Sequence, residues 1–184
     1  HRDAQPRFLQ NRSLDERRLN AALDIARAAG WDVTVATTAQ ENHATELARD
    51  AAARGVDVII VNGGDGTINE AINGIAGTAT ALAVLRGGTA NVWAGEIHMD
   101  RDPVKAMRQI TLGERRRIDV GRADGRCILL MAGIGFDADI VPGVSSRLKR
   151  LIGPFAYVVA GVIAVFRAKE RMARVRIDDA GSDV

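Results

Sequence analysis

The sequence predicts an α/β fold in which a parallel β-sheet lies between two layers of helices. Short apolar runs rich in β-branched residues alternate with segments in which apolar residues recur at helical spacing. The joints between these segments are short, as strand–helix–strand units of a parallel sheet require. Residues 56–61, "VDVIIV", are almost entirely apolar, which is expected of a central strand covered on both faces.

The elements of this sheet follow one another without long interruptions. Ser13 and Glu16 have the spacing of a capping box, so we expect the first helix to start at Ser13 and to end at Gly30. The remaining expected elements are a strand at residues 31–37, a helix at 43–54, the strand at 56–61, a helix at about 68–75, a strand at 81–85 and a helix at 103–112.

The pattern changes after Gly113. Residues 116–135 resemble two strands joined by the turn 123–126, in which Asp124-Gly125 is a strong hairpin signal. We therefore place a domain boundary at 112/113, with an α/β domain at residues 1–112 and the start of a β-rich domain at 113–184. A helix is expected within residues 153–170. The chain stops just after an expected strand, so we expect it to be part of a longer protein.

The composition excludes several classes of protein. The chain has 184 residues, 47% hydrophobic and 26% charged, which is typical of a globular protein. A formal net charge of +2 gives no argument for a nucleic-acid partner. The single cysteine, Cys127, excludes an internal disulfide framework and fits a reducing compartment. His43 and His98 lack metal-ligand spacing to any cysteine or second histidine, so no zinc site is expected.

Two glycine-rich joints follow expected strands, and ligands of parallel sheets bind at the carboxyl ends of the strands. In the first, "GGDGTINEA", we expect Gly63, Gly64 and Gly66 to permit positive φ and a close backbone approach to a ligand. Thr67 to Glu70 has the spacing of a second capping box, and the N-terminus of the helix that it starts would attract an anion. The alternative is a tight turn without a ligand.

A carboxylate beside a phosphate site needs its own explanation. Asp65 either helps to position Mg²⁺ or accepts a proton from an attacking hydroxyl. The alternative is a turn aspartate that bonds its own backbone. The loop is not a Walker motif, because no Gly-Lys-Ser/Thr follows, and it lacks the Gly-x-Gly-x-x-Gly dinucleotide fingerprint.

"GGDGTINEA", followed about twenty residues later by "GGTAN", resembles the catalytic domain of diacylglycerol kinases and of the related bacterial lipid kinases and sphingosine kinases. These share the architecture of their ATP site with NAD kinases. "RRIDVGRADGRCILLMAGIGFDADIV" and "RLKRLIGPFAYVVAG" extend the resemblance to about residues 30–173. It implies a three-layer, NAD-kinase-like ATP domain with a parallel sheet, followed by a truncated β-sandwich as second domain.

The resemblance also implies roles for individual residues. Asp65 lies at the catalytic centre, Thr38 matches a threonine near the nucleotide, and Asp137 matches a family aspartate of unassigned role. The metal ligands stay unidentified, since the further Mg²⁺ ligands and a proposed general base would follow the end of this chain. The residues expected to bind ATP are Thr38, Gly63, Gly64, Asp65, Gly66, Thr67, Ile68, Asn69, Thr89 and Asn91.

Three departures from the family pattern leave catalysis by this chain open. Nothing before Ser13 matches the strand and Asn-Pro-x-Ser-Gly loop that usually open the family's fold. Val92 stands where the family most often has aspartate. The chain also stops before the β-sandwich is complete.

Two basic segments are candidates for contact with anionic groups. The first surrounds an apolar run at residues 151–166, which is too short and too interrupted for a membrane-spanning helix and is either a buried core helix or a membrane contact. The second, Arg115 to Arg117, is either a solvated face or a contact with phosphate or membrane. The basic residues around the apolar run are Arg147, Lys149, Arg150, Arg167, Lys169 and Arg171.

We therefore predict an ATP-dependent lipid kinase that transfers the γ-phosphate of Mg-ATP to a lipid hydroxyl, with diacylglycerol or a related lipid favoured as acceptor. The expected partners are ATP and a lipid at the membrane surface, and the expected location is the cytoplasm with peripheral membrane contact. The alternatives are an NAD kinase and a nucleotide-binding module with impaired catalysis. The sequence names neither the lipid nor the oligomeric state, and a homo-oligomer remains open.

Overall fold

The computed structural model describes residues 6–10, 16–88, 90–131, 174–177 and 180–183. The chain divides into two compact units, residues 1–130 and residues 131–184, and each is described by itself.

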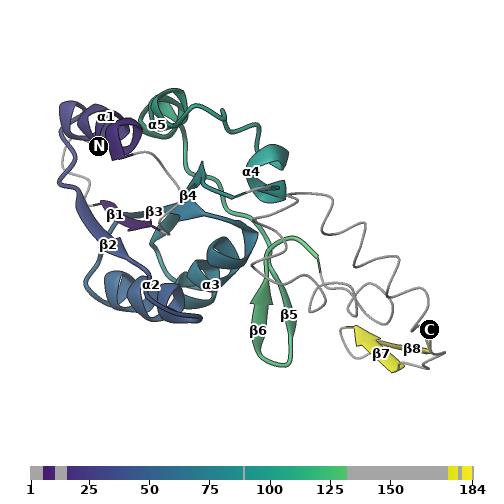
Figure 1. Ribbon diagram of the computed structural model, residues 1–184. Coiled ribbons are helices and arrows are strands. Elements are labelled where there is room, and N and C mark those ends of the chain that lie inside the picture. The colour runs from purple at the N-terminus through teal and green to yellow at the C-terminus, as the bar shows by residue number, and fades with distance from the viewer. Residues whose placement is uncertain (1–5, 11–15, 89, 132–173, 178–179, 184) are drawn as a thin grey trace. The chain divides into compact units, whose positions relative to one another are not determined.

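A four-stranded parallel sheet forms the centre of the first unit, as the sequence predicts (Figure 1). Its strands lie in the order β2-β1-β3-β4. β3 pairs with β1 on one side and with β4 on the other, so the strand that carries the first glycine joint is internal. The strands are β1 (Pro6–Gln10), β2 (Thr34–Thr37), β3 (Val58–Gly63) and β4 (Ala81–Arg86).

The strand β1 corrects the expectation that no opening strand precedes Ser13. It pairs with β2 through Arg7 and Thr34 and with β3 through Pro6 and Val58. Its sequence, "PRFLQ", has two large apolar residues and no clear alternation, so local pattern gives little signal for a strand. This segment is a strand because β2 and β3 pair with it on both sides, so tertiary context overrides its weak local strand propensity.

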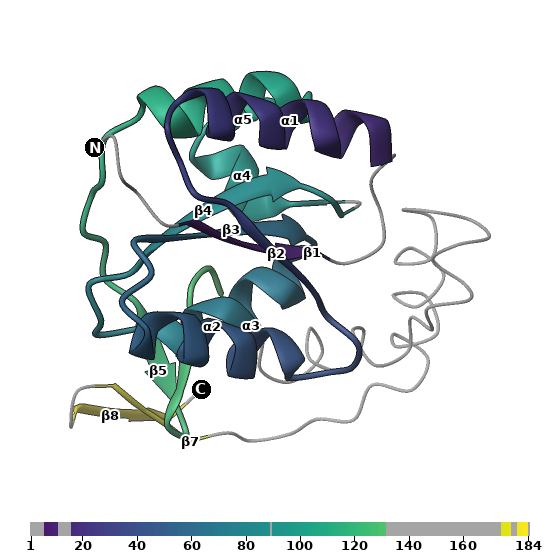
Figure 2. The same cartoon turned by 90° about the vertical axis from the view of Figure 1, so that its left-hand side faces the viewer.

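Helices cover both faces of the sheet, which gives the three predicted layers. α2 and α3 lie on one face, and α1 and α5 lie on the other (Figure 2). α5 has the predicted bounds, whereas the five-residue α4 is too short to show helical periodicity and was not expected. The helices are α1 (Glu16–Ala28), α2 (His43–Ala53), α3 (Asp65–Ile75), α4 (Val92–Glu96) and α5 (Pro103–Leu112).

The side chains of β3 form the centre of the core. Ile59 and Val61 pack with α2 and α3, and Val58 and Ile60 pack with α1 and α5. All six residues of β3 are buried, as predicted for a strand covered on both faces. Burying one such aliphatic side chain contributes about 1.5–3 kcal/mol to stability, so this strand fixes the two helical layers on the sheet.

The predicted hairpin after Gly113 is present. β5 (Gly121–Ala123) and β6 (Arg126–Ile128) are antiparallel, and both turn residues, Asp124 and Gly125, have positive φ, as a two-residue hairpin turn requires. Cys127 is buried in the core cluster that includes α3. This hairpin packs on the α/β core, and the first compact unit extends to Leu130. The domain boundary at 112/113 stays a prediction.

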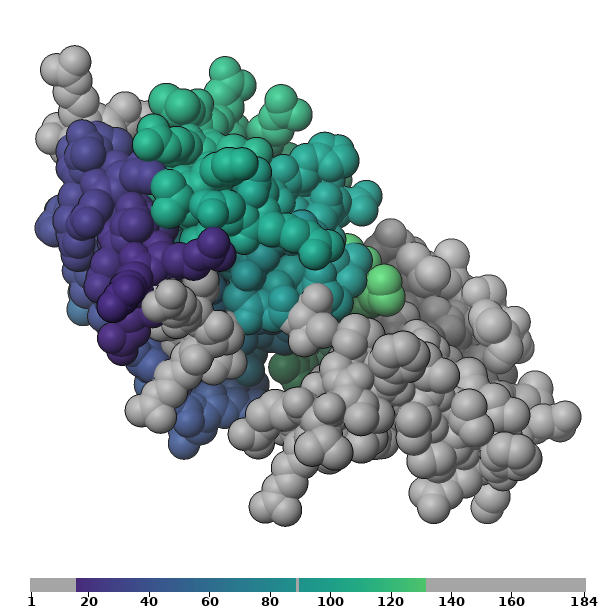
Figure 3. All heavy atoms as spheres, turned by 45° about the horizontal axis from the view of Figure 1, so that its top comes forward, coloured from purple at the N-terminus to yellow at the C-terminus, as the bar shows by residue number. Residues whose placement is uncertain are grey.

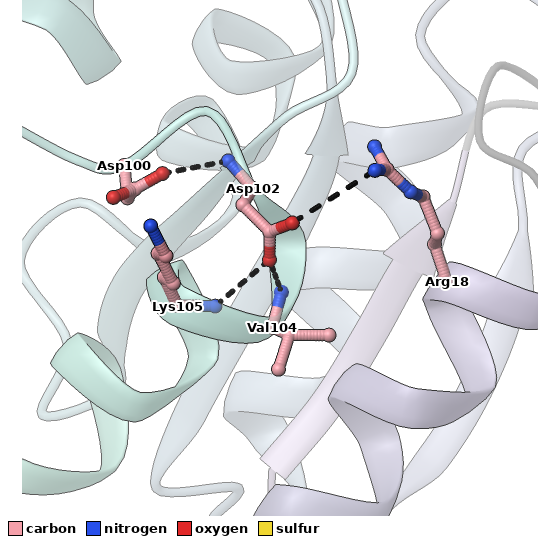
Figure 4. Close-up of polar contacts among 5 residues, drawn as sticks. All are labelled: Arg18, Asp100, Asp102, Val104 and Lys105. Atoms are coloured by element: carbon pink, nitrogen blue, oxygen red, sulfur yellow. Dashed lines mark hydrogen bonds and ion pairs between the residues drawn. The ribbon is translucent and has the colours of Figure 1, made fainter.

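Asp102 is the N-cap residue of α5, which lies beside α1 (Figure 3). Its Oδ1 accepts the backbone N–H groups of Val104 at 2.9 Å and of Lys105 at 3.1 Å (Figure 4). Its Oδ2 lies 4.0 Å from Nη2 of Arg18 on α1, and its own N–H donates to Asp100. The carboxylate therefore caps α5 and faces a cation on the neighbouring helix.

We expect the stabilisation by Asp102 to depend on its negative charge. The Lys105 N–H is the largest cause that lowers the Asp102 pKa below its ordinary value of 3.8. A lowered folded-state pKa stabilises the fold above the unfolded pKa, and this stabilisation is lost as the pH falls through the folded-state pKa. Asp102→Asn, which keeps a capping oxygen, should lower Tm by a few degrees at neutral pH and by less well below pH 3.8.

Thermal unfolding followed by circular dichroism across this pH range tests the expectation. Asp24→Asn is the matched control, since Asp24 is exposed on α1 and pairs with Arg27 of its own helix. A Tm difference between Asp102→Asn and the unsubstituted chain that stays constant with pH would contradict it.

In the second unit the structure describes one antiparallel hairpin, formed by β7 (Arg174–Ile177) and β8 (Ala180–Asp183). The predicted helix within residues 153–170 and the basic residues around it lie outside the described residues. The β-sandwich stays a prediction. Across the described ranges, no helix has the length and apolar character needed to span a bilayer.

Candidate functional site

The two glycine-rich joints meet at the carboxyl end of the sheet. β3 ends at Gly63 and pairs there with Arg86, the last residue of β4. A Cβ added to Gly88 would lie 2.6 Å from Cα of Gly64, so the two loops are in direct backbone contact. The order β2-β1-β3-β4 also places a topological switch point between β1 and β3, and ligands of open α/β sheets bind at such points.

The helix after the first joint starts earlier than predicted. Gly64 is the N-cap and Asp65 the first helical residue, so Thr67 lies inside the first turn and does not cap it. Glu70 does not reach back to form a capping box. Its Oε2 accepts the N–H of Ala44, in the first turn of α2, at 3.2 Å. The predicted capping box is therefore wrong, and Glu70 instead ties α3 to α2.

This start leaves the first turn of α3 open to a ligand. Gly64 provides no side chain to accept the N–H groups of Asp65, Gly66 and Thr67. A Cβ added to Gly66 would meet no described atom within 4 Å beyond its chain neighbours and the backbone of its own helix, so the described residues leave space beside the helix terminus. Exposed amides and the positive end of the helix dipole suit an anion such as a phosphate group.

The glycines of the first joint are not required for positive φ. Gly64 has φ −83° and ψ 177°, and neither Gly63 nor Gly66 is among the residues with positive φ. The positive φ that these glycines permit is therefore not used here. Close approach is the reason for Gly63, whose added Cβ would lie 2.8 Å from the Thr67 side chain.

Asn91 holds the two joints together. Its side chain, 1% exposed, donates through Nδ2 to the carbonyl oxygen of Gly63 and accepts through Oδ1 the N–H of Gly88, both at 2.7 Å. Its own backbone is left-handed, with φ 48°, a conformation that asparagine tolerates better than most residues. The structure thus brings Asn91 to the site, where its described contacts are with the protein backbone.

Asp65 makes a second connection between the joints. Its Oδ2 accepts the N–H of Val92 at 3.1 Å, and its Oδ1 accepts the N–H of Trp93 at 3.3 Å. The carboxylate at the start of α3 therefore satisfies the first turn of α4. The turn interpretation, in which Asp65 bonds its own backbone, does not describe these contacts. Each oxygen keeps lone pairs for a further partner.

The other predicted residues divide between the joints and more distant positions. Ile68 is buried in the core, where it packs against the sheet rather than facing a ligand. Asn69 accepts the N–H of Leu129 in the hairpin segment. Thr38 directly follows β2, two strands away from β3 in the sheet. Thr89 and Asp137 lie outside the described residues.

Two polar residues at this edge were missed by sequence analysis. Asn62 is fully buried, and neither Nδ2 nor Oδ1 has a hydrogen-bond partner among the residues described. Arg86 is half-buried, and its Nη2 would lie 3.0 Å from a Cβ added to Gly95 in α4. The signal for both was available: each is a polar residue that ends an apolar strand directly before a glycine joint.

The basic run at residues 115–117 is not part of this site. Arg115 pairs at 3.4 Å with Asp57, which directly precedes β3 and so marks the amino end of the sheet. The glycine joints are at the opposite end. Arg115 is therefore remote from the joints, and contact of this run with a phosphate or a membrane stays a prediction.

Known proteins are similar to this chain over most of its length. The model of the diacylglycerol kinase catalytic domain matches residues 10–123. A probable lipid kinase YegS-like of Chromohalobacter salexigens is 31% identical over 181 residues, which is 96% of this chain and 58% of that protein. A diacylglycerol kinase of Bacillus subtilis is 34% identical over 154 residues, covering 82% of this chain and 51% of its own length.

The solved structures agree on the fold. The crystal structure of a diacylglycerol kinase from Bacillus anthracis aligns with a TM-score of 0.73 and 23% identity over 98% of this chain and 61% of that one. The chain thus spans between half and three-fifths of the length of these curated relatives. The match of the family model covers more than half of the residues and includes both glycine joints, so this chain belongs to the diacylglycerol kinase catalytic domain family.

Proposed function

We propose that the protein carrying this chain is an ATP-dependent kinase that transfers the γ-phosphate of Mg-ATP to the hydroxyl group of a membrane lipid, diacylglycerol or a close relative. The observation that carries the proposal is the uncapped first turn of α3, with open space beside Gly66, in a chain of the diacylglycerol kinase catalytic domain family. An uncapped helix terminus beside a second glycine loop is suited to the phosphates of a nucleotide.

Phosphoryl transfer asks the protein mainly for positioning and charge neutralisation. The amides of Asp65, Gly66 and Thr67 would bind phosphate oxygens, and Arg86 stands at the same edge of the sheet with a charge of the right sign. Asn91 would keep the two loops at a fixed separation. Thr38 and Thr89 remain proposed nucleotide contacts, and Asn69 would act mainly through the hairpin segment that it bonds.

Bound Mg²⁺ would neutralise charge on the phosphates. The described part of the chain contains no group of three acidic, histidine or cysteine side chains that could hold a metal ion. Magnesium in kinases is commonly bound by one or two carboxylates together with the substrate phosphates. Asp65 has unused lone pairs for such a role, so the site fits a metal that arrives with the nucleotide.

Asp65 is the proposed catalytic residue, and it would orient or deprotonate the lipid hydroxyl. We expect Asp65→Asn to reduce kcat by about 10²–10⁴-fold, the usual loss when a general base is removed. Tm should fall by a few degrees as well, since an amide can accept only one of the two N–H groups of Val92 and Trp93 through oxygen.

Radiolabelled Mg-ATP, a membrane lipid extract and NAD test the function and the role of Asp65 together. Label in the organic phase that disappears in Asp65→Asn supports the lipid kinase, provided that calorimetry shows ATP still bound. Asp50→Asn is the matched control, because Asp50 is exposed on α2 and pairs with Arg54 of the same helix turn. Full activity of Asp65→Asn would remove Asp65 from the mechanism.

The same experiment separates the alternatives. Label in NADP would support an NAD kinase, whose ATP site has the same architecture. ATP binding without transfer to either acceptor would favour a nucleotide-binding module. Val92 favours this last alternative. It is 43% exposed at the start of α4, at a position where the family most often has aspartate.

A further inference from the structure

The side chains of two asparagines on α3 bond the backbone of β6 and of the residue that directly follows it. Oδ1 of Asn73 accepts the N–H of Cys127 at 2.8 Å, and Nδ2 of Asn73 donates to the carbonyl oxygen of Cys127 at 2.9 Å. Oδ1 of Asn69 accepts the N–H of Leu129 at 3.2 Å. One helix therefore satisfies three backbone groups of a segment that lies more than fifty residues further along the chain.

The contact has the geometry of a strand pairing. Alternate residues of a strand direct their N–H and C=O groups to the same side, so Cys127 and Leu129 share one edge. β5 pairs with β6 on the other side. The amide of Asn73 donates and accepts at one residue, as a neighbouring strand would. Asparagine is suited to this because it carries both a donor and an acceptor on one short side chain.

The two asparagines also have a fixed relation to the glycine joint. They are four residues apart and so lie on the same face of α3. Nδ2 of Asn73 donates to the carbonyl oxygen of Asn69 at 2.7 Å, which fixes the orientation of the amide. Asn69 follows Asp65 by one helical turn. A ligand that orders the first turn of α3 therefore also orders the residues that hold β6.

We propose that Asn69 and Asn73 are positioning residues that couple occupancy of the first turn of α3 to the hairpin β5–β6, from which the chain continues into its second unit. The inference rests on the proposed function, since it takes a nucleotide phosphate as the ligand at α3. Neither asparagine needs to touch that ligand, and their effect passes through the helix to the N–H groups of Cys127 and Leu129.

Amide hydrogen exchange at Cys127 and Leu129 reads this coupling directly. Saturating the protein with a non-hydrolysable ATP analogue should slow exchange of both N–H groups by about tenfold, because their opening then requires movement of a more ordered helix. Asn73→Asp keeps the acceptor for Cys127 but loses both donated bonds and sets a carboxylate against two carbonyl oxygens. Exchange at Cys127 should accelerate by about tenfold, and the analogue should no longer slow it.

Kinetics supply a readout that simple destabilisation would not give. Asn73→Asp should reduce kcat by about tenfold and leave KM for ATP within about twofold, because the phosphate amides are untouched while the hairpin is released. Asn69→Ala, which removes the acceptor for Leu129, should reduce kcat by less than Asn73→Asp, because it breaks one bond and sets no charge against carbonyl oxygens. Asn20→Asp is the surface control, since Asn20 is exposed on α1.

Each outcome decides between clear alternatives. If the analogue binds by calorimetry but leaves exchange at Cys127 and Leu129 unchanged, the coupling is overturned while the proposed function stands. If no nucleotide binds, both the proposed function and the coupling that rests on it are overturned. If Asn73→Asp does not fold, Asn69→Ala reads the same coupling at the Leu129 amide, and unchanged protection by the analogue in that variant contradicts the proposal.

Discussion

Replacing Asn91 with alanine should lower Tm by about 5–15 °C and abolish nucleotide binding at concentrations that saturate the unsubstituted protein. The substitution leaves the carbonyl oxygen of Gly63 without its partner in a buried place, and it removes the acceptor of the more exposed Gly88 N–H. The orphaned buried carbonyl costs about 1–3 kcal/mol, and alanine at the left-handed φ of 48° costs about 1–2 kcal/mol more. The sum is about 2–5 kcal/mol of lost stability.

Asn91→Asp tests whether the hydrogen bond that Asn91 donates to Gly63, rather than the size of the side chain, stabilises the loops. Aspartate has almost the same shape and can still accept the N–H of Gly88, but it cannot donate to Gly63 and would place a negative charge in a buried site. We expect Asn91→Asp to be at least as destabilised as Asn91→Ala. Thermal unfolding and calorimetric titration with ATP measure both effects. Wild-type affinity in Asn91→Ala would show that the loops keep their arrangement without the amide.

Adding a methyl group at Gly88 and at Gly66 should have opposite effects on stability. A Cβ at Gly88 would lie 2.6 Å from Cα of Gly64, which is backbone and cannot rotate away. Gly88→Ala should therefore push the loops apart and cost about 1–3 kcal/mol. A Cβ at Gly66 meets nothing within 4 Å, and alanine is favoured over glycine in a helix by up to about 1 kcal/mol.

Nucleotide affinity should nevertheless fall in both variants. The methyl group of Gly66→Ala would occupy the space beside the first turn of α3 where we place the phosphates, so ATP affinity should drop by about tenfold or more in a protein that unfolds at the same or a higher temperature. Gly77→Ala is the reference for destabilisation away from the site: Gly77 has φ +81°, so alanine should lower Tm there, but ATP affinity should be kept because Gly77 lies beyond the far end of α3. Unimpaired ATP binding by Gly66→Ala would move the phosphate site elsewhere.

The elements that sequence analysis predicted correctly are those whose signal is local. The composition of residues 56–61 alone predicts β3. Asp124-Gly125 predicts the hairpin turn, and Pro103 predicts the first turn of α5. β1 and α4 gave no such signal. β1 is a strand because two neighbours pair with it, and α4 is capped by Asp65, 27 residues earlier in the chain.

At the site too, prediction succeeded where the signal is local and failed where the contacts are distant in sequence. "GGDGT" correctly located a joint at the carboxyl end of the sheet, because strand, glycine and helix signals are contiguous there. The capping box at Thr67–Glu70 failed since Glu70 has a better partner in α2, which spacing along the chain does not reveal. Asn69, predicted as a nucleotide-binding residue, contacts Leu129, which spacing along the chain does not reveal either. Asn62 and Arg86 come to the same edge only because β3 pairs with β4.

The position of β1 has a consequence for how the chain folds. β1 is internal to the sheet although it precedes both of its pairing partners in the chain. It must wait for β2 and then for β3, where the partner of Pro6 is Val58, about fifty residues later. Such non-local parallel pairing is slow, and both edges of β1 stay open until it is complete. β3 and β4 are closer in sequence, so a two-stranded intermediate from which the N-terminal segment is absent is the natural kinetic trap. Any need for a chaperone during synthesis should therefore come from the late pairing of the five residues of β1 rather than from the apolar strand β3.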